Sequence, residues 1–186
     1  MKKAFNLARR KWEWCTDNPV FRVSMEKENN TRDRWLTVDE EQRLLAAATP
    51  WLRELVVFAI YTGMRMGEIL ALTWAAVDLF RRTLTVFRSK NGERRTTPVN
   101  TTVLDLLKYK HASRPGTVDI VFHSESQTPL DGSNIRRALT IALDSAKIQD
   151  LHFHDLCHTF ATRMVQAGID LYYIRCSGSW AISRPS

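Results

Sequence analysis

The sequence predicts an α+β fold that is mainly helical and carries one small antiparallel sheet of three strands. Apolar residues recur at helical spacing through most of the chain, for example at Ile135, Leu139 and Leu143. Residues 83–99 instead contain an alternating strand and Asn91-Gly92, a strong short signal for a β-hairpin. With 44% apolar and 25% charged residues, the chain has the composition of a globular protein that can build a core.

The chain is basic, and its cysteines are scattered. It has 27 Lys and Arg against 20 Asp and Glu, a net charge of +7 and a pI near 9.6. This charge favours a polyanionic partner, nucleic acid first and an acidic membrane second. Cys15, Cys157 and Cys176 are odd in number and widely spaced, so neither a disulfide framework nor a zinc cluster is expected. Because no run of 18 apolar residues and no signal-peptide pattern occurs, we expect a cytoplasmic protein without a membrane partner.

The first 34 residues predict a helix followed by a linker. Within residues 2–15, Phe5, Ala8 and Trp12 share one stripe of a basic helix. A helix lying on a membrane surface is one interpretation. We favour the last helix of a truncated domain over residues 1–18. Residues 19–34 are polar and predict a linker to a larger domain over residues 35–186.

Two helices are expected next. Thr37-Val38-Asp39-Glu40 is a capping-box pattern. Thr49-Pro50 then predicts a helix with proline at its first position. Because this second helix is apolar nearly all round, we expect it at the centre of the core.

The chain breaks between two helices near Arg65. Gly63 can take the left-handed conformation that ends a helix. Arg65 then stands at the start of the next helix, which we expect to end near Trp74, and Glu68 follows one turn later. This pattern suits a surface corner with an Arg–Glu pair and an anion-binding site equally well.

A basic hairpin follows the second of these helices. Residues 83–87 predict the outgoing strand and residues 94–99 the return strand, so Lys90 lies at the tip. The charges could protect an exposed sheet edge or contact a DNA backbone. The flanking arginines are Arg88, Arg94 and Arg95.

The elements after the hairpin are two helices and a short strand. Residues 101–110 predict a helix, and residues 120–122 predict the third strand of the sheet. Ser133 is expected to cap a helix with the apolar spacing described above. Its other face carries Arg136, Arg137 and Lys147.

Side chains with functional chemistry gather near the start of a late helix. His154, Cys157 and His158 stand at i, i+3 and i+4 and share one face. A zinc site is one interpretation, but no further ligand is evident, so no metal is expected. Core histidines are the ordinary alternative. Three histidines within seven residues, near a predicted anion site, favour a functional cluster.

Two boxes in this order resemble the tyrosine recombinases, the phage integrase family. The first is Thr62-Gly63-Met64-Arg65-x-x-Glu68-Ile69-x-x-Leu72-x-Trp74, and the second runs from His154 to Thr162. The resemblance covers roughly residues 35–180. It implies the family's catalytic domain, and residues 1–18 resemble the end of its core-binding domain. It also implies double-stranded DNA as partner, strand exchange through a phosphotyrosine link, and no metal or other cofactor.

The resemblance assigns roles to matching residues. Arg65 matches the arginine that clamps the scissile phosphate, and Glu68 matches its acidic neighbour. Lys90 matches the lysine that protonates the leaving oxygen. His154 matches a histidine that transfers protons and binds the phosphate, and His158 is a supporting residue of the same box.

Two positions depart from the family pattern. Cys157 stands where the family has its second arginine, and Ser179 where it has a further histidine or tryptophan. The nucleophile should follow, yet no tyrosine lies after Tyr173. Tyr172 and Tyr173 match a helix that packs as core. We therefore expect a defective prophage or mobile-element remnant, truncated at both ends, that still binds DNA.

Two alternatives remain open at this stage. In the first, the chain is a non-catalytic DNA-binding or regulatory module that holds DNA through Arg65, Lys90 and the hairpin. In the second, it is an active recombinase that receives its tyrosine from a partner subunit, either a second copy or a full-length recombinase protomer.

Overall fold

The structure, a computed structural model, describes residues 2–15, 18, 34–86, 95–116 and 118–169. The chain divides into two compact units, Met1–Arg32 and Asp33–Ser186. The first unit contains α1 (Lys2–Lys11), which ends earlier than the predicted range 2–15. Its assignment as the last helix of a core-binding domain stays a prediction.

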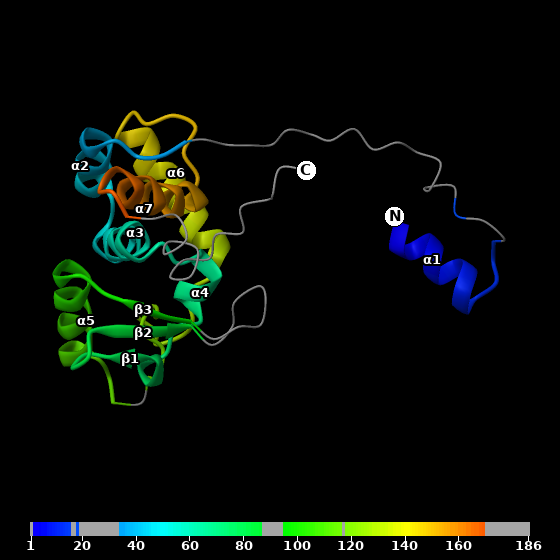
Figure 1. The fold of residues 1–186 in the computed structure, drawn as a ribbon, viewed down its shortest axis with the longest axis horizontal. Helices are drawn as coiled ribbons and strands as arrows, with labels where there is room; N and C mark the ends of the chain where they lie inside the picture. Colours follow the sequence, from blue (N-terminus) through cyan, green and yellow to red (C-terminus); the bar gives the residue numbers. More distant parts are fainter. Residues whose placement is uncertain (1, 16–17, 19–33, 87–94, 117, 170–186) are drawn as a thin grey trace. The chain divides into compact units, whose positions relative to one another are not determined.

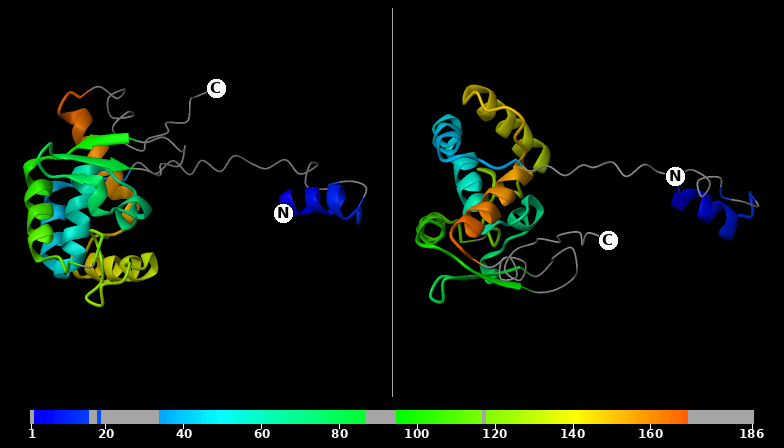
Figure 2. Two further views of the ribbon diagram at one scale, coloured as in Figure 1. Left: turned by 90° about the horizontal axis from the view of Figure 1, so that it is seen from below. Right: turned by 45° about the horizontal axis from the view of Figure 1, so that its top comes forward.

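The second unit is built around α3 (Pro50–Thr62), which lies between α7 (Phe153–Gln166) and α5 (Thr101–Ser113) in Figure 1. Most of its side chains are buried. This confirms that the helix with apolar residues nearly all round is central. α3 packs most extensively on α7 and also contacts α5, which runs beside it in Figure 1 and in the left view of Figure 2. The remaining helices are α2 (Val38–Ala47), α4 (Met66–Leu70) and α6 (Gly132–Ser145), with a 3₁₀ turn, η2 (Trp74–Ala76).

Residues predicted to begin helices do so at α2 and α3. The Thr37 side chain accepts a hydrogen bond from the Glu40 N–H, and the Glu40 carboxylate accepts one from the Thr37 N–H. Arg34 also donates two hydrogen bonds to Glu40 and holds the pKa of that carboxyl at about 2, mainly through this contact. Pro50 occupies the first turn of α3, as predicted, although the Thr49 side chain makes no capping hydrogen bond.

Further helix boundaries also differ from the prediction. The helix after Arg65 ends at Leu70 and gives way to η2, so Trp74 lies in a separate 3₁₀ turn. The N-cap of α6 is Asp131, not Ser133, because the helix begins at Gly132 and the Asp131 carboxylate accepts the Asn134 N–H at 3.4 Å. Ser133 therefore lies inside the first turn.

The sheet has three antiparallel strands in the order β1 (Val77–Asp78), β2 (Thr83–Val86) and β3 (Arg95–Pro98). Val86 pairs with Arg95 at the end of the β2–β3 ladder, which confirms the hairpin pairing. The third strand was predicted wrongly at residues 120–122. Ile120 forms only an isolated bridge with Thr73, because its segment hydrogen-bonds to the loop after α4.

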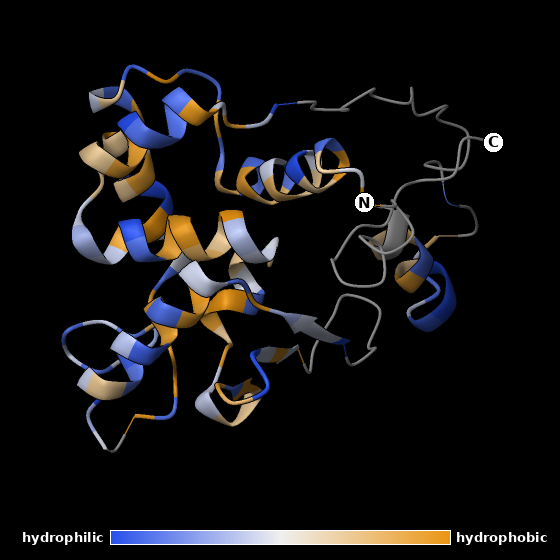
Figure 3. Cartoon of the chain, turned by 60° about the vertical axis from the view of Figure 1, so that its left-hand side comes forward, coloured by the Kyte–Doolittle hydropathy of each residue, from blue (hydrophilic) through white to orange (hydrophobic). Residues whose placement is uncertain are grey.

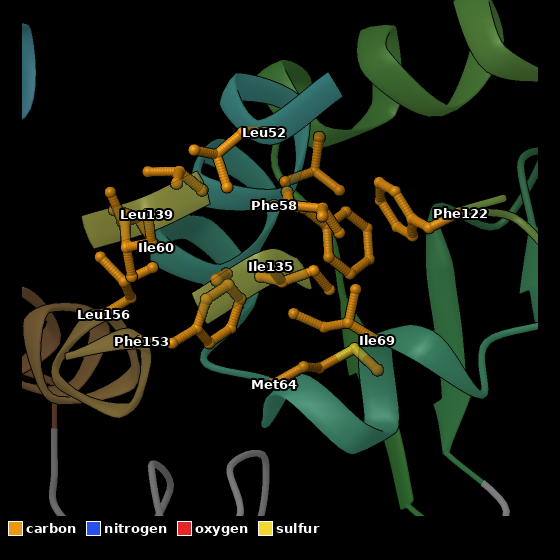
Figure 4. Close-up of a cluster of buried hydrophobic side chains, with 14 of the residues drawn as sticks. Leu52, Phe58, Ile60, Met64, Ile69, Phe122, Ile135, Leu139, Phe153 and Leu156 are labelled. Atoms are coloured by element: carbon orange, nitrogen blue, oxygen red, sulfur yellow. The ribbon is translucent and has the colours of Figure 1, made fainter. Parts of the chain in front are cut away.

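The core of the second unit contains buried side chains from both the helices and the strands. Figure 4 shows Phe58 of α3 beside Phe122, with ring centroids 4.9 Å apart, and Leu156 of α7 near Ile60. All of these side chains are at most 2% exposed. Figure 3 shows polar and apolar residues alternating around the helices, as burial of one face requires. None of the described helices is long and apolar enough to cross a bilayer.

Candidate functional site

The site begins where α3 ends at Gly63. Gly63 has a φ of +63° and caps the helix through its N–H, which donates to the Ala59 carbonyl. A Cβ at this position would lie 2.5 Å from Cδ1 of Phe160 on α7. Glycine is therefore required both for the backbone turn and for the close approach of α7. This geometry brings the Met64-Arg65 segment against the first turns of α7.

Arg65 is the N-cap residue of α4, and its side chain remains partly open. Its backbone N–H donates to Oε2 of Glu68 at 3.0 Å. Its guanidinium Nη1 lies 3.9 Å from Oε1 of Glu68, and 31% of the side chain is exposed. The expected Arg65–Glu68 contact is thus present, with a cation that still faces solvent.

Glu68 is shared with a second arginine, Arg95. Nη1 and Nη2 of Arg95 donate to the two carboxylate oxygens of Glu68 at 3.2 and 2.8 Å. The exposed fractions of these side chains are only 10% for Arg95 and 8% for Glu68. Arg95 is therefore a buried side chain that ties β3 to α4, and its predicted contact with DNA stays a prediction. Sequence spacing could not reveal this pair, since 27 residues separate its members.

Cys157 is a neutral hydrogen-bond donor to the residue that precedes Arg65. Its Sγ donates to the Met64 carbonyl at 3.1 Å, and the residue is 2% exposed. Burial raises the pKa of the thiol to about 12, with a smaller contribution from the Glu68 carboxylate. The thiol is therefore protonated at neutral pH, so this position supplies neither a cation nor a thiolate nucleophile.

His154 and His158 lie one turn apart on α7. Their rings meet edge to face, with centroids 5.1 Å apart. His154 is exposed and His158 half-buried, while the Cys157 thiol is directed at a backbone carbonyl. Within the described part of the chain, no three His, Cys, Asp or Glu residues gather as a metal would require.

The start of α7 is fixed by two residues that the sequence analysis did not single out. The His152 N–H donates to the buried carboxylate of Asp155 at 2.7 Å, which caps the helix. Thr159 accepts a hydrogen bond from the Leu36 N–H at 2.8 Å, so the segment before α2 is tied to α7. The spacing of Asp155, three residues after His152, is a capping pattern that could have been recognised in the sequence.

A pocket of about 550 Å³ opens beside Arg65 and His154. Arg136 and His152 also line it, and the described lining residues include no carboxylate. The sequence pattern places Arg136 on the polar face of a helix but does not indicate that it lines a pocket. The remaining lining residues are Met66, Gly67, Leu139, Thr140, Leu143, Leu151 and Phe153.

Other predicted site residues lie outside the described part of the chain. Lys90, Arg88 and Arg94 fall in residues 87–94, and Ser179 falls in residues 170–186. Their proposed roles therefore stay predictions. Among the predicted residues that are described, Arg65, Glu68, Arg95 and Cys157 meet around the α3–α4 break, and His154 joins Arg65 at the pocket.

Known sequences similar to this chain are integrases and recombinases. A profile of the Phage integrase family matches residues 34–182. The Shufflon-specific DNA recombinase of Escherichia coli is 34% identical over 175 residues, which cover 90% of this chain and 42% of the relative. The Integrase of Salmonella phage P22 is 31% identical over 192 residues, which cover 97% and 49%. The chain thus spans just under half the length of these relatives.

Solved structures share the same fold. The XerA recombinase superposes with a TM-score of 0.69 at 28% identity, over 86% of this chain and 58% of its own. The lambda integrase catalytic core gives 0.66 at 21% identity, over 82% and 95%. A lambda integrase dimer bound to a core site gives 0.74 at 20% identity, over 100% and 73%. The two lambda structures support the fold alone, and they confirm the predicted α+β catalytic-domain architecture.

Proposed function

The chain belongs to the phage integrase family, and from this premise we propose that it binds duplex DNA at the Arg65 pocket without cleaving it unaided. The observation that carries the proposal is the pocket lining. Arg65, Arg136, His152 and His154 surround one concavity whose described lining contains no carboxylate. Such a surface attracts the phosphate backbone of DNA.

Arg65 is the central phosphate contact in this proposal. Its guanidinium is partly open, and a planar fork with several N–H donors suits two oxygens of one phosphate. Glu68 and Arg95 hold the residue at the start of α4. His154 adds a donor at the same pocket. Lys90, with Arg88 and Arg94, would approach DNA from the hairpin.

The lack of unaided cleavage rests on Cys157. Phosphoryl transfer builds negative charge on the nonbridging oxygens, and fixed cations lower the barrier. A buried, protonated thiol that already donates to the Met64 carbonyl cannot replace a guanidinium. Loss of one preorganised donor of this kind lowers the rate on the order of a hundredfold or more. We propose that the chain is a defective family member that acts on DNA in the cytoplasm.

Two measurements on the full chain test this function. Fluorescence anisotropy with a labelled duplex should show binding that weakens steeply with salt. Arg65→Gln should weaken it further, while Arg81→Gln, which removes the same charge from the exposed β1–β2 turn, should have little effect. A nicked suicide substrate should give no covalent adduct on a denaturing gel. Absence of binding at low salt would refute the DNA-binding role, and an adduct would refute the loss of cleavage.

A second candidate is a recombinase assembly completed by other protomers. It is favoured by the fold neighbours, because lambda integrase was solved as a dimer on a core site and as a tetramer on a Holliday junction. In this case the chain would bind DNA beside further copies or full-length protomers that supply the tyrosine. Light scattering of the chain with a duplex would then show a stoichiometry above one chain per site.

A further inference from the structure

We propose that Arg136 holds a second backbone phosphate of the DNA strand whose first phosphate is held by Arg65. This inference rests on the proposed function and adds a contact to it. Arg136 lies on α6, about seventy residues after Arg65 of the first box, and no matching motif includes it. The structure nevertheless places it at the same pocket as Arg65 and His154.

The position of the Arg136 guanidinium supports this inference. A Cβ built on Gly132 would lie 3.8 Å from Nη2 of Arg136 and 3.2 Å from Cε of Met66. Met66 directly follows Arg65 and is the first residue of α4. The Arg136 head group is therefore folded back along α6 toward Gly132, and the Met66 side chain from the start of α4 approaches the same glycine.

The chemistry of the pocket fits one stretch of a DNA strand. Its described polar lining is cationic or neutral, so a phosphate meets no carboxylate there. Among the described residues, Arg136 has no ion-pair partner, and its charge remains available for an anion. The apolar lining gives the sugar or base beside the phosphate a surface to contact. It comprises Met66, Leu139, Leu143, Leu151 and Phe153.

Arg137 provides a matched comparison. It is the next residue of α6, it is also exposed, and it carries the same charge. It does not line the pocket. If α6 only presents a solvated basic face, Arg136 and Arg137 should contribute alike to DNA binding. A specific phosphate contact predicts that they differ.

The test measures the salt dependence of duplex binding for the full chain and three variants. Each phosphate contact contributes about 0.9 to the slope of log K against log salt. Arg136→Gln should lower the slope by about that amount, Arg137→Gln should leave it near the wild-type value, and Arg136→Lys should keep most of it. Circular dichroism and thermal melts should show that all three variants fold, since both arginines are exposed.

The possible outcomes separate the two proposals. If the wild-type chain binds and the two glutamine variants lose the same slope, or Arg137→Gln loses more, the Arg136 contact is refuted and the proposed function stands. If the wild-type chain does not bind at low salt, both proposals fail. A loss confined to Arg136→Gln, restored by Arg136→Lys, supports the contact.

Discussion

Gly63 brings α3 and α7 closer than any larger residue would allow, because a Cβ there would lie 2.5 Å from Cδ1 of Phe160. Its φ of +63° adds a second requirement for glycine. Gly67, four residues later, meets no atom within 4 Å of a built Cβ and lies inside α4. The two glycines therefore have opposite expected responses to the same substitution.

Gly63→Ala should destabilise the second unit by about 2–5 kcal/mol, since a left-handed L-residue costs about 1–2 kcal/mol and an overpacked contact about 1–3 kcal/mol. Gly67→Ala should be neutral or stabilise by up to about 1 kcal/mol, because alanine suits a helix better than glycine. Urea denaturation of the two variants measures both values. If the two variants had the same free energy of unfolding, the Phe160 contact would not restrict the size of the side chain at residue 63.

Burial of the Cys157 thiol makes the stability of the fold depend on pH. The thiol has a pKa of about 12 in the fold, against an ordinary value of 9.0. A raised pKa in the folded state favours the protonated form. Its contribution to stability is therefore full below pH 9 and is lost as the pH rises toward 12, because the unfolded chain ionises first.

Wild-type protein should accordingly lose more stability than Cys157→Ala between about pH 8 and pH 10.5, where the unfolded thiol ionises. Comparing urea midpoints at the two pH values cancels the lysine and tyrosine titrations common to both proteins. A pH dependence identical in the two proteins would mean that the thiol is not held protonated. Cys157→Ala should itself lower stability at pH 8, since it removes the hydrogen bond to Met64.

At the scale of elements, Glu68 joins a short helix to the sheet. α4 has five residues and would be marginal alone. The Glu68 carboxylate in this helix accepts hydrogen bonds from the Arg65 N–H and from both Nη groups of Arg95 in β3. The Glu68–Arg95 pair is nearly fully buried, so removal of one member leaves the other charge buried without this partner.

A double-mutant cycle should expose this coupling. Arg95→Met and Glu68→Gln should each destabilise the fold by about 3–5 kcal/mol, whereas the double variant should cost less than their sum by about 0.5–3 kcal/mol. Thermal and urea denaturation of the four proteins supply the measurements. Strict additivity would mean that the two side chains act independently.

Across the whole molecule, the sequence predicted the elements better than their long-range contacts. The helix around Phe58 and the hairpin could be predicted, because each has a local hydrophobic period or a turn signal in the sequence. The strand at Val77–Asp78 could not, since two residues are too few to show a hydrophobic period. For the site, the two boxes identified Arg65 and His154. The ion pair of Arg95 and the pocket position of Arg136 depend on packing between distant segments.

The buried Arg95 has one more consequence for the site. Arg65 and Glu68 alone would form a neutral pair, and the negative charge of Glu68 would oppose an approaching phosphate. Arg95 neutralises Glu68 through both carboxylate oxygens, so the group of three side chains carries a net charge of +1. A side chain that is only 10% exposed thus keeps this group of three, as a whole, positively charged.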